Sequence, residues 1–194
     1  MRPLRPPQHA LLMLLLLAFA PQAAAAEPLE QSASVFTGIY VGVAADVPMD
    51  GGPSERRDIE IAIRAAERGV LEIDSVNVTR VGDRRDVPGV RYAATAVRLA
   101  PRSPGFYIES RRRDPFGTDD PVEPMRGDAL RWAVLDERGL TSLSFGVLED
   151  GRYELQEVLR RRVPDGLEIE YRRIVDGVVV RRMVGFAVKV EERR

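Results

Sequence analysis

The chain has 194 residues and a nearly balanced charge, with 29 Lys and Arg against 30 Asp and Glu and a net charge of −1 at pH 7. It contains no cysteine, and its single histidine is His9. The part of the chain beyond His9 therefore cannot build a Ser-His-Asp triad, a cysteine nucleophile, a His- or Cys-ligated haem or a typical zinc site. The mixed charge gives no electrostatic reason to expect nucleic acid as a partner.

The beginning of the chain has the pattern of a cleavable signal peptide. Arg2 and Arg5 form a positive start, residues 10–20 are an unbroken apolar run, and residues 24–26 are small, as a cleavage site requires. A membrane-spanning helix needs about 20 apolar residues, so this run is too short for a permanent anchor. We therefore expect residues 1–26 to be removed on export, which leaves no membrane span and a protein that is periplasmic in, or secreted from, a bacterium.

Beyond the predicted cleavage site, a short polar tether over residues 27–34 leads into one domain over residues 35–194. In this domain short apolar runs alternate with turn residues, which is typical of an all-β protein. The first strand is expected at residues 35–44, and alternating isoleucines predict the second at residues 57–64. Further strands are expected at residues 71–78, 90–99, 106–109, 130–134, 143–147, 153–162, 167–175 and 178–190.

The connections between these strands predict how they pair. Asp176 and Gly177 lie between two apolar runs, and an Asp-Gly pair supplies the positive φ angles of a two-residue type I′ hairpin. Most other connections are short turns and none has the pattern of a long crossover helix, so sequential strands should pair as hairpins. Ten strands in one open sheet would leave two exposed edges, which closure removes. The sequence thus predicts a single antiparallel up-and-down barrel of about ten strands.

The opening of the first strand resembles that of the lipocalin-like (calycin) barrels. Gly38 and Tyr40 stand where those proteins have a Gly-x-Trp motif, with tyrosine in place of tryptophan. In the family an arginine from the last strand packs on the tryptophan and closes the base of the barrel. The resemblance implies that Arg181 or Arg182 has this role beside Tyr40, and that the barrel contains a small-molecule pocket.

Five aromatic residues lie on the apolar side of their predicted strands and are candidates for lining such a pocket. Their rings, hydroxyl groups and indole could orient a ligand. The alternative is an ordinary core, because a small barrel can be filled by its own side chains. The candidate ligand-binding residues are Tyr40, Trp132, Phe145, Tyr153 and Tyr171.

Residues 110–128 form the longest segment without a strand pattern. Long segments of this kind in compact domains are often functional. Phe116 could pack onto the barrel mouth as part of a lid, with Arg111 and Arg113 facing an anionic ligand. The alternative is a solvated loop in which opposite charges pair with each other.

The function expected from the sequence is that of an exported lipocalin-like barrel that binds a small, partly apolar ligand without covalent chemistry. We expect no metal, no cofactor and no catalytic residue. One alternative is a structural or protein-interaction module of the cell envelope, with a filled barrel and a protein partner. A second alternative is a hydrolase or lyase that uses paired carboxylates, since such chemistry needs neither histidine nor cysteine.

Overall fold

The computed structural model describes residues 33–48, 54–81, 84–85, 87–110 and 122–190. The predicted signal peptide and most of the predicted tether lie outside these ranges. So do Arg111, Arg113 and Phe116 of the predicted lid. Within the described ranges, none of the helices has the length and apolar character needed to cross a bilayer.

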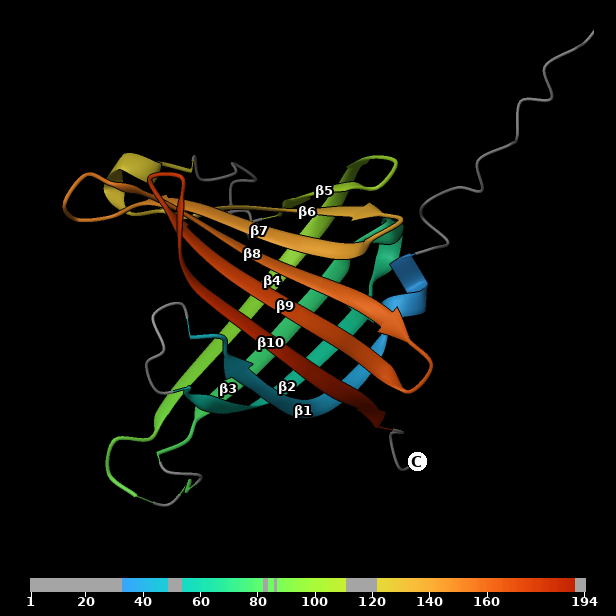
Figure 1. Cartoon of the computed structure of the whole chain (residues 1–194). Coiled ribbons are helices and arrows are strands. Elements are labelled where there is room, and N and C mark those ends of the chain that lie inside the picture. Colours follow the sequence, from blue (N-terminus) through green and yellow to red (C-terminus); the bar gives the residue numbers. More distant parts are fainter. Residues whose placement is uncertain (1–32, 49–53, 82–83, 86, 111–121, 191–194) are drawn as a thin grey trace, which may run out of the picture.

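Ten strands and three short 3-10 helices make up the described fold (Figure 1). The helices are η1 (Ser34–Phe36), η2 (Glu67–Gly69) and η3 (Pro124–Arg126). The strands are β1 (Gly38–Asp46), β2 (Arg56–Ala65), β3 (Leu71–Thr79), β4 (Arg91–Ser103), β5 (Phe106–Glu109), β6 (Leu130–Asp136), β7 (Gly139–Val147), β8 (Tyr153–Val163), β9 (Gly166–Val175) and β10 (Val178–Val190).

The strands form one closed antiparallel barrel in which each pairs with its neighbours in sequence and β1 pairs with β10. Figure 1 shows two ends, with η1 near one and η3 near the other. We call these ends the base and the mouth. The predicted all-β, up-and-down barrel is confirmed.

Local signals account for much of this topology. Asp176 and Gly177 have φ angles of 48° and 81°, as a type I′ turn requires, and they join β9 to β10. Ile59, Ile61 and Ile63 all point inward and are buried, because alternate residues of a strand face the same side of the sheet.

The first strand begins later than the sequence predicted. Residues 34–36 form η1 instead of extending β1, and Phe36 is buried in the core. The apolar Val35 and Phe36 resemble the start of a strand, but only Phe36 turns toward the interior while Val35 stays exposed. η1 therefore belongs to the closure of the base.

A packed apolar core fills the base half of the interior. Its side chains come from alternate positions on nearly every strand, so the closed sheet supplies all the walls of one common core. Its largest fully buried members are Tyr40, Ile63, Leu71, Leu99, Tyr107, Leu140 and Leu167.

Tyr40 anchors the base, and its cationic neighbour is Lys189. The Tyr40 hydroxyl donates to the Phe36 carbonyl at 2.8 Å, while the Lys189 ammonium donates to the Thr37 carbonyl at 2.8 Å and lies 6.0 Å from the Tyr40 ring centroid. The Lys189 side chain passes so close to Gly38 that a Cβ atom added to Gly38 would lie 2.5 Å from the Lys189 Cε. Gly38 and Tyr40 thus lie together at the base of the barrel.

Arg181 does not take part in this closure, which corrects the role expected of it. Tyr40 is paired with Lys189 across the β1–β10 ladder, whereas Arg181 bonds to Asp46 at the opposite end of β1. Arg182 faces outward and pairs with Glu170. The antiparallel register places the two arginines near the mouth, so the cation at the base must come from the other end of β10.

Replacing Tyr40 with phenylalanine should lower the free energy of unfolding by about 1–2 kcal/mol, because the buried Phe36 carbonyl loses its donor. Urea denaturation would measure the change. Tyr92→Phe is the matched control, since the Tyr92 side chain is 71% exposed and should tolerate the change. Equal stability of the two variants would contradict the anchoring role of the Tyr40 hydroxyl.

Candidate functional site: a polar cup at the barrel mouth

The mouth half of the interior is hollow. A cavity of about 430 Å³ lies above the core and is bordered at its rim by Gly127, Ala129 and Leu148. Its walls come mainly from β3, β4, β6, β7 and β8, at positions that alternate along each strand. We call this cavity the cup. Its volume lies within the range of small-molecule sites.

The lining of the cup is mixed in polarity. Ile73, Val97, Leu99 and Val158 supply an apolar wall, which continues the core below. Across the cup the inward positions of β6, β7 and β8 are mostly polar, and Ser75 and Thr95 share a hydrogen bond of 2.9 Å between their hydroxyls. The polar lining residues are Ser75, Thr95, Arg131, Ser142, Ser144, Glu154, Gln156 and Arg160.

Most charged groups at this end of the barrel have a partner of opposite charge. Arg131 donates to Glu109 at 3.0 Å, and Arg173 and Gln156 both donate to Glu154. Among the described residues that line the cup, Glu154 is the one carboxylate. The described lining of the cup thus supplies one carboxylate, whereas hydrolysis by paired carboxylates uses two.

Arg181 belongs to a second charged cluster at the mouth. It makes two hydrogen bonds to Asp46, at 3.0 and 2.6 Å, and one to Glu55 at 3.0 Å. Glu55 also accepts from Arg91 at 2.6 Å. Although burial acts to raise the pKa of Glu55, the bonds and charges of Arg181 and Arg91 hold it below its usual value. This cluster ties the mouth ends of β1 and β10 to the start of β2.

Arg160 is the exception among the charged lining groups. It is 5% exposed, and its Nη1 donates a hydrogen bond to the Ser142 hydroxyl at 2.8 Å. Its Nε is buried without an acceptor, and no carboxylate of the described residues pairs with it. Burial alone lowers the pKa of Arg160 to about 10, so the side chain remains charged at neutral pH.

This buried charge costs the fold stability. One pKa unit corresponds to 1.36 kcal/mol, so the lowering of the Arg160 pKa to about 10 amounts to roughly a few kcal/mol. Because the folded pKa lies below the unfolded one, the cost is fully present below pH 10 and declines as the pH rises above it. A fold that keeps such a charge inside a cavity has a candidate binding group.

The structure brings only two of the five predicted aromatic residues into the barrel. Tyr40 lies in the buried core at the base, and Tyr171 packs against that core, where burial raises its pKa. Neither is among the residues that line the cup.

The other three aromatic residues lie on the outer face. Trp132 borders the cup, but strand alternation turns its side chain away from the inward Ala133, into an outer hollow that it shares with Leu143. Phe145 and Tyr153 stack at 6.4 Å on the same outer face. The polar side chains of β6, β7 and β8 near the mouth line the cup. Because successive side chains of a strand face opposite sides of the sheet, the apolar side chains of these strands face outward.

Sequence reasoning missed Arg160. It belongs to the run Arg160, Arg161 and Arg162, which resembles an exposed basic stretch. Strand alternation turns Arg161 away from its two neighbours, and Arg161 pairs with Glu168 outside the barrel. Glu154, Gln156 and Arg160 share one face of β8, opposite to the face that carries Arg161. The structure shows that this polar face points into the barrel.

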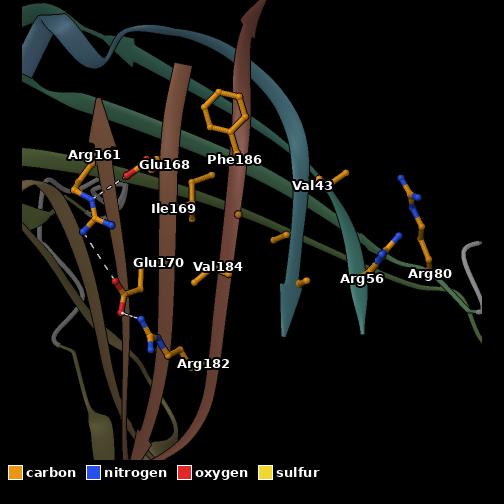
Figure 2. A pocket seen from close by; sticks show the side chains of 13 residues that line it. Val43, Arg56, Arg80, Arg161, Glu168, Ile169, Glu170, Arg182, Val184 and Phe186 are labelled. Atoms are coloured by element: carbon orange, nitrogen blue, oxygen red, sulfur yellow. Dashed lines mark hydrogen bonds and ion pairs between the residues drawn. The ribbon is translucent and has the colours of Figure 1, made fainter. Parts of the chain in front are cut away.

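Figure 2 shows a second hollow, which lies on the outer face of the barrel near β1, β9 and β10 and has a volume of about 680 Å³. Arg161 pairs with Glu168 and Glu170 there, and Arg182 pairs with Glu170. The hollow is larger than the cup, but it is an open depression whose acidic groups are paired with arginines. Its apolar residues include Val43, Val184 and Phe186.

Comparison with known proteins supports the class of fold. The barrel is similar to the solved structure of the S-type phycobiliprotein lyase CPES from Guillardia theta, with a TM-score of 0.50 and 10% sequence identity over 86% of this chain and 94% of that chain. No family model matches the sequence, and no curated protein matches it. The closed ten-stranded barrel and this structural neighbour are consistent with a calycin-like barrel.

Replacing Arg160 with methionine should raise the free energy of unfolding by about 1–2 kcal/mol in the ligand-free protein, because a buried, uncompensated charge is removed. Chemical denaturation at neutral pH would measure it. Arg161→Met, one residue along β8 and outside the barrel, should change stability by less than about 0.5 kcal/mol. A loss of stability in Arg160→Met would show that Arg160 supports the fold.

Proposed function

We propose that this protein is an exported, lipocalin-like barrel that binds a small, partly apolar ligand in its cup and carries out no covalent chemistry. The single observation that carries the proposal is the division of the interior into a packed base and a cavity of about 430 Å³ at the mouth. A barrel built only as a scaffold would gain stability by filling this space, since cavities reduce packing interactions.

The lining supports a ligand of mixed character. The apolar wall of Ile73, Val97, Leu99 and Val158 can remove hydrocarbon from water, and the facing hydroxyl, amide and guanidinium groups can orient a polar end. Small-molecule sites typically use only a small number of such polar groups. A wholly apolar ligand would leave the polar wall without partners.

Export is part of the proposal and rests on residues 1–26, with their positive start, short apolar run and small residues before the cleavage site. Disulfides are common in exported domains, but this chain has no cysteine. The closed barrel has no unpaired strand edges, and its core includes residues from nearly every strand. Packing and sheet closure can therefore stabilise the domain without covalent cross-links.

A second candidate function is an interaction module of the cell envelope. The observation that favours it is an apolar band on the outer face of β1 and β10, where the side chains are 40–52% exposed. Exposed apolar surface of this kind often marks a protein contact. The band consists of Val41, Val43, Val180, Val184, Phe186, Val188 and Val190.

Filling the cup should abolish ligand binding. A Cβ added at Gly146 would meet no atom within 4 Å, and Gly146 lies in the cup wall, so Gly146→Phe should place its ring in the cavity. The neutral fluorophore N-phenyl-1-naphthylamine should bind the wild-type protein with a saturable rise in emission. We expect Gly146→Phe to weaken this binding at least about tenfold, or by about 1.4 kcal/mol.

Ala94→Phe provides the matched control, because Ala94 is exposed on the outer face of β4 and the same ring would lie outside the barrel. Its binding of the fluorophore should equal that of the wild type. If the wild type binds no fluorophore, or if Gly146→Phe and Ala94→Phe bind it equally, the cup is not the site and the interaction module becomes the better explanation.

A further inference from the structure

Arg160 lies at the floor of the cup. Along β8 the inward side chains run from Glu154 at the mouth through Gln156 and Val158 to Arg160. The next layer belongs to the core, because Arg160 is paired in the β7–β8 ladder with Leu140, which is fully buried. A ligand group that reaches Arg160 must therefore enter the cup first and lie deepest.

Among the residues that the structure describes, no acid pairs with the guanidinium of Arg160. Other arginines on the inner side of the mouth half each pair with an acid, whereas the guanidinium of Arg160 has only the neutral Ser142 hydroxyl. A buried charge is strongly favoured when an opposite charge joins it. The paired arginines are Arg57, Arg91, Arg131, Arg173 and Arg181.

We propose that the cup receives a small amphiphile with one carboxylate, which enters first and pairs with Arg160 while its apolar part lies against Ile73, Val97 and Leu99. This inference rests on the proposed function and specifies the class and the orientation of its ligand. The observations that carry it are the depth of Arg160, its burial and its missing counter-charge.

A monocarboxylate fits the site better than other anions. One unbalanced guanidinium neutralises one negative charge, so a doubly charged phosphate would bring its own uncompensated charge into a buried place. The planar carboxylate also matches the fork of guanidinium N–H donors. The hydroxyls of Ser142 and Ser144, on adjacent inward positions of β7, provide further donors beside it.

Competition between matched ligands tests the proposal. Octanoate, 1-octanol and octyl sulfate would each displace N-phenyl-1-naphthylamine at pH 7.5 from the wild type, Arg160→Met and Arg161→Met. We expect the wild type to bind octanoate at least about tenfold more tightly than 1-octanol, since hydrogen bonds to charged groups are the strong ones. Arg160→Met should lose this preference and keep its affinity for the neutral fluorophore, whereas Arg161→Met should behave as the wild type.

The outcomes separate the two proposals. If the fluorophore binds but octanoate and 1-octanol compete equally in the wild type, or if Arg160→Met keeps the preference, the role of Arg160 is overturned and the binding function stands. Octyl sulfate that binds more tightly than octanoate would overturn the choice of a carboxylate. Failure of the wild type to bind any probe would overturn both proposals. If Arg160→Met does not fold, Arg160→Gln is tested in its place. Binding of the fluorophore to that variant then shows that its cup is intact.

Discussion

Pairing between β1 and β10 is the constraint on which the rest of this structure depends. It closes the sheet, removes both edges and commits every second side chain of ten strands to one enclosed interior. That interior must hold both the residues that stabilise the domain and any residues that bind a ligand. The chain separates the two tasks along the barrel axis, with an apolar core at the base and a mixed lining at the mouth.

Ion pairs connect neighbouring strands in the mouth half, whereas apolar packing connects the strands at the base. Inward arginines are tolerated there because acids on neighbouring strands pair with them, as Glu109 pairs with Arg131 and Glu154 with Arg173. Arg160 departs from this rule at the level where the polar lining meets the core. Burial of a charge without an opposite charge is unfavourable, and a ligand that paired with Arg160 would offset that cost.

Several features of the barrel show why the predicted fold did not place the predicted aromatic residues inside the cup. Alternation predicted that Trp132, Phe145 and Tyr153 share a face with other apolar side chains, and they do, but that face is outside. An apolar side of a strand usually marks the interior, and near the cup of this barrel the inward side is polar. At the base, the expected cation above Tyr40 is present, but it is Lys189 because register, rather than residue type, selects the partner.

The strands, the Asp176–Gly177 turn and the closed meander could be predicted from the sequence because they arise from short-range preferences and from the general cost of unpaired edges. The two arginines of β8 at positions 160 and 161 look alike in sequence. Only the assembled barrel distinguishes them, by burying Arg160 in the cup with no acid of the described residues paired to it and by placing Arg161 beside Glu168 on the outer face. Burial and charge balance depend on side chains from strands far apart in the chain, so they exist only once the barrel has closed.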